Sequence, residues 1–481
     1  MMRVIMLLIL WSVFIIQNAS SQSPSADKER MIYISSSEGD DSNPGTLLKP
    51  LKSLSALRDE DRVNTCILLK AGDVFFDRLK NLQNCEIGKY GLGENPVMCG
   101  LFMLKDIEAW EYMGNDVWRL DFSKYKNFSG YQYSSRTKTN QTGNVGLIYS
   151  YEDDHIYGHL VKSQEELLND GDFFTSDVFA KDQITQETFH YLYFKWHEHP
   201  RALGNLCFVS GSYGVVNLRN CNMHDVSIVG FGYNAITSID STTIKNCSVD
   251  LIGGSILIGY GKWIRFGNGI EVNVSNGPRF NVLVDSCMIS RTYDTATTIQ
   301  GSRKKIESPG NIHFTNNIII HCRQGFEWYM NAVGSDPEYN DCSFQHNTML
   351  LCGDNMFNIP STMNDCCFLC QDIAFRHIEI SDNICVGGNY LCTYQHYNLL
   401  HDNIVYLYPK MFLLHQKHGE LGTIYPKSES DVLAYKDIVH DDSRIFYVEK
   451  GAMLENYGYK TYMEQIEKRL RHIVDFLRYY K

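Results

Sequence analysis

Two glutamates and an aspartate stand in three short segments whose spacing could support acid–base chemistry. The segments cover residues 267–273, 293–301 and 324–329, and each alternates apolar with polar residues. A period of two is typical of β-strands, whose successive side chains point to opposite faces. Two carboxyl groups on one face of such a sheet can act as general acid and general base.

The alternation predicts how the three strands align. Inward-facing positions are expected at Ile270, Thr297 and Phe326, and again at Val272, Ile299 and Trp328. The opposite face then carries one column with Glu271, Thr298 and Glu327, and a second column with Asn273, Gln300 and Tyr329.

Strand spacing indicates which carboxyl pairs could work together. Adjacent rungs of a parallel sheet lie about 4.8 Å apart, so Glu271 and Glu327, two rungs apart, would be separated by roughly 9–10 Å at their backbones. Inverting glycosidases use carboxyl groups about 6.5–9.5 Å apart, and retaining enzymes use groups about 5 Å apart. Asp294, on the turn before Thr298, could approach either glutamate. Either pairing remains open at this stage.

The neighbours of the carboxyl groups suggest their roles. We expect Glu327 to be the acid, because Phe326 and Trp328 should lower the local polarity and raise its pKa. Glu271 should be hydrated and act as the base, with Asp294 as its rival. The alternative is that all these carboxylates only make the face soluble.

The surrounding side chains are candidates for holding a substrate, and aromatic rings can stack on the apolar faces of sugars. The candidate substrate-binding residues are Gln300, Tyr329, Asn273, Arg265 and Tyr293. Arg265, with Arg303, Lys304 and Lys305, could bind a uronate carboxylate or could be an ordinary loop charge.

Net charge and the N-terminal sequence indicate which binding partners and which cellular location to expect for this protein. The net charge of −12 and the lack of a basic stripe argue against nucleic acid and anionic membranes as partners. Arg3, the apolar run over residues 4–16 and the small residues before Gln22 are typical of a signal peptide at residues 1–21. We therefore expect a secreted or periplasmic protein without a membrane span.

The 15 cysteines are an odd number. Cys221, Cys247 and Cys287 each follow a polar residue at what look like equivalent points of successive repeats, which predicts a column of buried thiols. Cys366, Cys367 and Cys370 with His377 could form a zinc site, but without a second ligand pair we expect thiols or a local disulfide and no metal.

The order of segments predicts a repeat with an insertion. Residues 22–103 enter the repeat, residues 104–210 interrupt it, residues 211–410 resume it, and residues 411–481 end with helical spacing over residues 462–480. Apolar strands with Asn or Gly at the bends, and no helical periodicity between them, favour stacked β-coils over an α/β fold.

The opening strand and its turn, with Asp-Ser-Asn-Pro-Gly-Thr at residues 41–46, resemble the N-terminal entry of secreted right-handed parallel β-helix proteins of the pectate-lyase-like superfamily. The segments around Glu271, Asp294 and Glu327 resemble β-helix glycoside hydrolases that act on polysaccharides. The resemblance implies an all-β right-handed parallel β-helix with an inserted β-rich module, a C-terminal helix, and acidic catalytic residues on one face.

Three functions fit this sequence. The favoured one is a polysaccharide-degrading glycoside hydrolase that needs no cofactor. A polysaccharide lyase would use a basic side chain and often Ca²⁺, but no clear cluster of aspartates supplies the oxygen ligands. A non-catalytic glycan-binding β-helix would bind the same ligands without turnover.

Overall fold

The computed structural model describes residues 30–104, 106, 108–125, 143–150, 152–175, 190–257, 264–353, 357, 365–371, 378–388, 390–393, 400–401, 403–406, 410–415 and 421–424. Within these ranges the chain is an all-β protein built on three long sheets of parallel strands, as predicted. The chain passes from one sheet to the next and returns one rung further on, so the architecture is a parallel β-helix. Its right-handed winding stays a prediction. No helix in the described ranges is long and apolar enough to cross a membrane.

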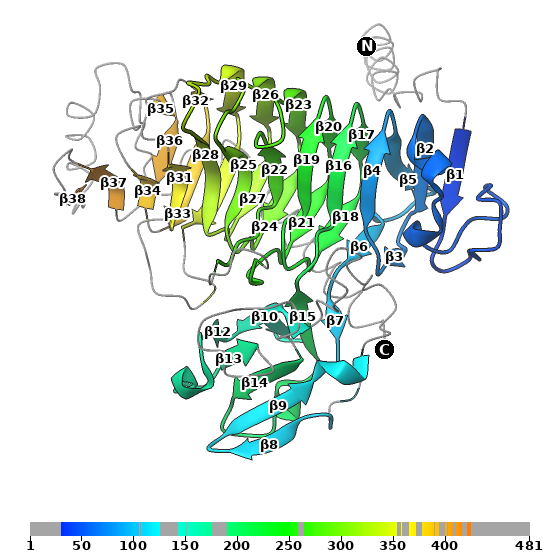
Figure 1. The fold of residues 1–481 in the computed structure, drawn as a ribbon, viewed down its shortest axis with the longest axis vertical. Helices are drawn as coiled ribbons and strands as arrows, with labels where there is room; N and C mark the ends of the chain where they lie inside the picture. Colours follow the sequence, from blue (N-terminus) through cyan, green and yellow to red (C-terminus); the bar gives the residue numbers. More distant parts are fainter. Residues whose placement is uncertain are drawn as a thin grey trace, which may run out of the picture.

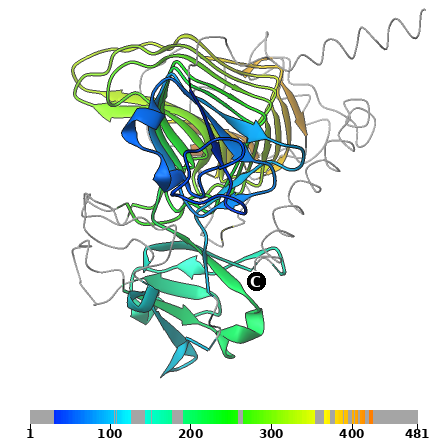
Figure 2. The ribbon, with the colours of Figure 1, turned by 90° about the vertical axis from the view of Figure 1, so that its right-hand side faces the viewer.

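Figure 1 shows the strands of the β-helix side by side as successive rungs, and Figure 2 shows the coils stacked behind one another. Sheet 1 contains β1 (Arg30–Ile34), β2 (Thr65–Lys70), β5 (Glu86–Tyr90), β17 (Asn222–His224), β20 (Thr243–Lys245), β23 (Phe280–Asp285), β26 (Gly310–Thr315), β29 (Asn340–Gln345), β32 (Glu379–Ser381) and β35 (Leu400–His401). Sheet 2 contains β3 (Val74–Phe75), β6 (Val97–Cys99), β18 (Ser227–Val229), β21 (Ser248–Asp250), β24 (Met288–Ser290), β27 (Ile318–Ile320), β30 (Thr348–Cys352), β33 (Ile384–Gly388) and β36 (Ile404–Tyr406).

Sheet 3 carries the three segments with the candidate carboxyl groups. It contains β4 (Leu79–Gln83), β16 (Val215–Arg219), β19 (Ile236–Asp240), β22 (Ile270–Asn273), β25 (Thr295–Arg303), β28 (Gln324–Ala332), β31 (Cys366–Cys370), β34 (Tyr390–Thr393), β37 (Lys410–His415) and the antiparallel β38 (Leu421–Ile424). The core of the β-helix is filled by inward residues of all three sheets, including Ile270, Phe314 and Phe326.

The bends between sheet 1 and sheet 2 follow one pattern. The first bend residue has a positive φ and is Asp225, Asn246, Ser286, Asn316, His346 or Asp382 in successive rungs. Asn and Asp tolerate this left-handed conformation better than most residues. The second bend residue is buried, and in the later rungs it is an asparagine: Asn317, Asn347, Asn383 and Asn403. Each asparagine side chain accepts a hydrogen bond from the backbone N–H of the preceding rung, as Asn347 Oδ1 does from Asn317 at 3.0 Å.

The cysteine prediction is correct for two of its three residues. Cys247 and Cys287 occupy the second bend position of neighbouring rungs and are buried against each other. Cys221 is also buried, but it lies at a different bend, between β16 of sheet 3 and β17 of sheet 1, where it contacts Cys85. The expectation that all three stand at equivalent points was therefore wrong for Cys221.

An inserted β-rich module lies between β6 and β16 in the sequence. One sheet joins β7 (Phe102–Met103), β10 (Val145–Ser150), β11 (His155–Tyr157) and β15 (Leu206–Ser210), and the other joins β8 (Glu111–Gly114), β9 (Val117–Asp121), β12 (His159–Leu160), β13 (Asp172–Thr175) and β14 (Tyr191–Lys195). Short 3₁₀ helices are η1 (Leu54–Ala56), η2 (Asp59–Arg62), η3 (Phe122–Tyr125), η5 (Gln164–Glu166) and η6 (Pro200–Leu203). In Figure 1 the module lies below the β-helix, near the sheet 2 strands of the early rungs.

An ion pair from a buried arginine attaches the module to the β-helix. Arg291 Nε donates to Asp250 Oδ1 at 2.8 Å, and its Nη1 donates to Asp154 Oδ1 of the module at 2.5 Å. Tyr149 of the module also donates to Asp154, at 2.8 Å. Asp250 and Arg291 are 0% and 5% exposed, so their ion pair is buried, whereas the Asp154 side chain is 50% exposed.

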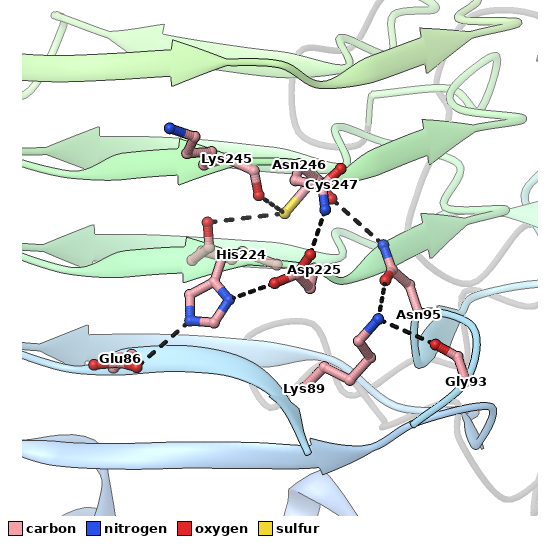
Figure 3. A network of polar contacts seen from close by, with 10 residues as sticks. Glu86, Lys89, Gly93, Asn95, His224, Asp225, Lys245, Asn246 and Cys247 are labelled. Carbon is pink, nitrogen blue, oxygen red and sulfur yellow. Dashed lines mark hydrogen bonds and ion pairs between the residues drawn. The ribbon is translucent and has the colours of Figure 1, made fainter. Parts of the chain in front are cut away.

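The β-helix continues in space across the insertion. β5 of the early rungs pairs with β17, and β6 pairs with β18. Polar contacts reinforce this junction, as Figure 3 shows: His224 lies between Asp225, at 2.8 Å from Nδ1, and Glu86, at 3.5 Å from Nε2. Asn95 Nδ2 reaches the backbone oxygen of Asn246 at 3.4 Å.

The predicted signal peptide at residues 1–21 and the predicted C-terminal helix over residues 462–480 lie outside the described residues. Both stay predictions.

Candidate active site

The predicted alignment of the three segments is confirmed. Glu271 of β22 pairs with Thr298 of β25, and Thr298 pairs with Glu327 of β28. Val272, Ile299 and Trp328 lie in the core, so the glutamates emerge on the opposite face of sheet 3. The adjacent column joins Asn273, Gln300 and Tyr329 in the same register.

The face that carries the glutamates is covered. Glu271 is 4% exposed and Glu327 is 3% exposed. The expectation that Glu271 is hydrated was therefore wrong. A buried carboxyl group must either receive hydrogen bonds or bind a proton, because burial without partners disfavours the charged form.

Glu271 receives four hydrogen bonds. Its Oε2 accepts from Asn234 Nδ2 at 2.7 Å and from the Thr237 hydroxyl, and its Oε1 accepts from Asn273 Nδ2 at 3.1 Å and Gln300 Nε2 at 2.7 Å. All four partners present donors, which are what a carboxylate accepts.

The orientation of these amides is fixed by their other contacts. Asn234 Oδ1 accepts from the backbone N–H of Asn268 at 2.9 Å, and Asn273 Oδ1 accepts from Ser275 at 2.9 Å. The amide nitrogens therefore face Glu271, which is held rigidly in place.

Glu327 has a different environment. Among the described residues, Gln371 Nε2 donates a hydrogen bond to Glu327 Oε1. Burial, and next the negative charge of Asp294, raise the pKa of Glu327 well above its ordinary value. The predicted direction is confirmed, but Phe326 and Trp328 are not next to the carboxyl group, because both rings lie in the core.

Asp294 is the third carboxyl group of the cluster. Burial raises its pKa to about 6, the positive charge of Arg323 opposes that rise, and the negative charge of Glu271 adds to it. Asp294 also contributes to the raised pKa of Glu327, so the three predicted carboxyl groups interact electrostatically. This mutual interaction requires that they lie close together.

Arg265 and Tyr293 have structural contacts. Arg265 Nε donates to the backbone oxygen of Gly254 at 2.6 Å, and its Nη2 donates to that of Gly146 in the module at 2.9 Å. The Arg265 guanidinium lies 4.1 Å from the centre of the Tyr293 ring, and Arg323 lies 5.5 Å from it. Tyr293 is 6% exposed. Substrate binding by this pair stays a prediction.

The remaining predicted substrate-binding residues form the second column. Asn273 and Gln300 direct their amide nitrogens at Glu271 and are partly exposed. Tyr329 is also partly exposed and lies in line with Gln300 on the outer face. Tyr329 is thus the predicted aromatic whose ring has the best access to a ligand.

Several residues of the site were not predicted from the sequence. They are Asn234 and Thr237, which hold Glu271, Gln371, which contacts Glu327, and Arg323 with Asp365, which are joined at 2.6 Å. Thr237 pairs with Glu271 in the ladder, so extending the register to β19 would have found it. Gln371 and Asp365 flank β31, where no alternation marks their positions.

No group of His, Cys, Asp or Glu in the described ranges is arranged to hold a metal ion. Cys366, Cys367 and Cys370 are buried along β31. His377 lies outside the described residues.

Comparison with known proteins gives distant structural similarities only. No family model and no curated protein sequence matches the chain. The solved structure of XylC in complex with xylose is similar at 11% identity and a TM-score of 0.41, over 82% of this chain and 73% of that one. The GH136 lacto-N-biosidase from Eubacterium ramulus is similar at 13% identity and a TM-score of 0.32, over 81% of this chain and 66% of that one. A structure described as a glycoside hydrolase is similar at 9% identity and a TM-score of 0.37, over 80% of this chain and 95% of that one. TM-scores below 0.5 establish neither fold nor activity, so both are argued from this chain's own residues.

Proposed function

We propose that this protein is a secreted glycoside hydrolase that cleaves a polysaccharide or oligosaccharide with Glu327 as the general acid and Asp294 as its carboxylate partner. The observation that carries the proposal is the cluster of Glu271, Asp294 and Glu327, in which Glu271 and Glu327 share one column of sheet 3 and burial with mutual charge raises the pKa values of Glu327 and Asp294. Two carboxyl groups with separated pKa values are what glycoside hydrolysis requires.

Each carboxyl group has a role that follows from its surroundings. Glu327, whose pKa burial raises well above its ordinary value, is the proton donor to the departing glycosidic oxygen. Asp294, with a pKa of about 6, is mostly ionised at pH 7 and activates water or attacks the sugar carbon. Of the two predicted bases, Asp294 is preferred here because the oxygens of Glu271 are already occupied by four donors.

Glu271 supports the reaction through its fixed charge. Its negative charge raises the pKa of both other carboxyl groups. A fixed negative charge also stabilises the positive charge that develops on the sugar ring in an oxocarbenium-like transition state. Glu271 is therefore an electrostatic residue in this proposal, rather than a proton acceptor.

The test is incubation with a panel of neutral and acidic polysaccharides. New reducing ends without ultraviolet absorbance indicate a hydrolase, absorbance from an unsaturated uronate indicates a lyase, and binding without either product indicates a glycan-binding protein.

On a cleaved glycan, Glu327→Gln and Asp294→Asn should each lower kcat by about 10²–10⁴-fold while the far-ultraviolet circular dichroism is unchanged. Glu338→Gln, at an exposed position in the loop before β29, is the matched control and should keep full activity. Near-full activity of both site variants would reject the assignment.

A further inference from the structure

Two arginines lie beside the carboxyl cluster, and both already make polar contacts with other protein groups. Arg323 Nε donates to Asp365 Oδ1 at 2.6 Å, and Asp365 is 1% exposed. The positive charge of Arg323 also acts on Asp294. Its single charge also acts on Glu327, so three neighbouring carboxyl groups share it.

Arg265 links the inserted module to the β-helix through hydrogen bonds. Its guanidinium donates to backbone oxygens of Gly254 and Gly146, and one face covers the Tyr293 ring. Gly146 belongs to β10 of the module, whereas Gly254 follows β21 of the β-helix. Turning Arg265 toward a substrate would break both hydrogen bonds in a largely buried place, which is costly.

The other basic residues near sheet 3 are directed elsewhere. Arg303, Lys304 and Lys305 are exposed at the far end of β25, where Arg303 is roughly 16 Å along the strand from Thr298. Arg279 donates to the backbone oxygen of Asn273 at 2.9 Å and is influenced by Asp240 and Arg219 rather than by the cluster. In the described part of the chain, Asp294, Glu327 and Asp365 therefore share the charge of one arginine, Arg323, and Glu271 adds a further carboxyl group to the cluster.

We infer that the subsite at this cluster binds an uncharged sugar residue and excludes a uronate. Asp365 contributes to this selectivity, because its ion pair with Arg323 leaves that arginine less able to bind a substrate carboxylate. The inference rests on the proposed hydrolase function and adds its substrate class. A uronate would bring a further carboxylate into a buried place that already has an excess of acidic groups, and such like-charge contacts are strongly unfavourable. Sugar hydroxyls carry no charge, and each can both donate and accept a hydrogen bond.

The experiment compares one glycan in two forms. The first neutral glycan that the panel shows to be cleaved is oxidised at its primary alcohols, which converts neutral residues into uronates with the same linkages. We expect kcat/KM for the oxidised form to be at least about 10²-fold lower, since like-charge contacts cost several kcal/mol. Binding of both forms to Glu327→Gln, measured by calorimetry, should show the same preference without turnover.

A charge change tests the role of Asp365. Asp365→Asn keeps an oxygen acceptor for Arg323 but removes the competing charge, so the ratio of oxidised to neutral kcat/KM should rise by about tenfold. Asp285→Asn is the matched control, because Asp285 is also in an ion pair, with Lys245 at 3.2 Å, but on sheet 1. That variant should leave the ratio unchanged.

The outcomes separate the two proposals. Hydrolysis of the oxidised glycan as fast as the neutral one, or hydrolysis of acidic glycans alone, would overturn the substrate inference and leave the hydrolase standing. If a folded Asp365→Asn variant has an unchanged ratio of oxidised to neutral kcat/KM, Asp365 does not contribute to the selectivity. Release of unsaturated uronates, or neither cleavage nor binding of any glycan, would overturn both proposals.

Discussion

At the scale of single residues, the three carboxyl groups differ mainly in how many donors reach them. Among the described residues, Glu271 has four donors and Glu327 one, Gln371, while Asp294 has the charge of one shared arginine. Burial raises the pKa of Glu327 and of Asp294. The proposed acid and base roles follow from these partners, several of which are far away in the sequence, such as Asn234 and Gln371.

The sequence could predict where the carboxyl groups stand but not how buried they are. The period of two fixes which residues share a face, and the observed pairing of Glu271, Thr298 and Glu327 agrees with it. Burial depends on what covers that face. Asn234, whose amide reaches Glu271, is 37 residues earlier in the chain, and Gln371 is 44 residues after Glu327. No local pattern reports such distant neighbours.

Asp294 gives the proposal a pH dependence. Because its pKa is about 6 and the ionised form is the active one, kcat/KM should rise as pH increases from 5 to 7. At higher pH the rate should fall as Glu327 loses its proton. The measurement is the pH profile of kcat/KM for the wild type and Asp294→Asn. If the variant's residual activity keeps the same rise near pH 6, another group is responsible for it.

Asp294 should also affect stability in the opposite sense. Its folded pKa lies above its ordinary value of 3.8, so ionisation opposes folding, and stability is lost as pH rises through about 6. Asp294→Asn cannot ionise and should therefore gain in Tm relative to the wild type at pH 7 more than at pH 4. An equal difference at both pH values would contradict the raised pKa.

At the scale of structural elements, the bends set the alignment of the rungs. Asn347 Oδ1 accepts from the N–H of Asn317 at 3.0 Å, and Asn347 Nδ2 donates to the oxygen of Phe314 at 3.0 Å. Each asparagine thus satisfies backbone groups that the turn leaves unpaired. Local sequence does not reveal which bend is which, since Asn220-Cys221 and Asn246-Cys247 have the same residues and the same positive φ at asparagine. That identity explains why Cys221 was assigned to the wrong column.

The asparagine ladder predicts a specific loss of stability. Asn347→Leu keeps the approximate volume but leaves the Asn317 N–H and the Phe314 oxygen without this partner. Two buried groups that lose their partner should together cost about 2–6 kcal/mol of unfolding free energy. Denaturant unfolding measures it, with Asn331→Leu at an exposed position of β28 as the control. Equal stabilities of the two variants would show that the ladder does not determine stability.

At the scale of the whole molecule, a charged contact joins the inserted module to the β-helix, between the buried Arg291 and the half-exposed Asp154. Arg291 lies between Asp250 of the β-helix and Asp154 of the module. Removing one partner of a buried ion pair leaves an uncompensated charge and costs about 3–5 kcal/mol. Arg291→Met should therefore be strongly destabilising, whereas Asp250→Asn with Arg291→Met should recover part of the loss. Unfolding free energies of the two single variants and the double variant provide the test, and purely additive effects would contradict it.

The junction across the insertion should respond to pH, because His224 contacts Asp225 from its own rung and Glu86 from the rung before the module (Figure 3). The hydrogen bond to Asp225 is the main cause that raises the pKa of His224 above its ordinary value of 6.5, and burial opposes it. A raised histidine pKa in the folded state means that the stabilisation is complete below pH 6.5 and is lost as pH rises through the folded pKa.

His224→Gln should therefore lower the Tm at pH 5.5 and have little effect at pH 8. The loss should stay within the roughly 0.2–1 kcal/mol of a solvent-screened ion pair, because about a third of the ring is exposed. His155→Gln, at an exposed position of β11 in the module, is the control. An equal loss for His224→Gln at both pH values would mean that the imidazole only packs against Gly88, over which it lies, and that its charge does not stabilise the junction.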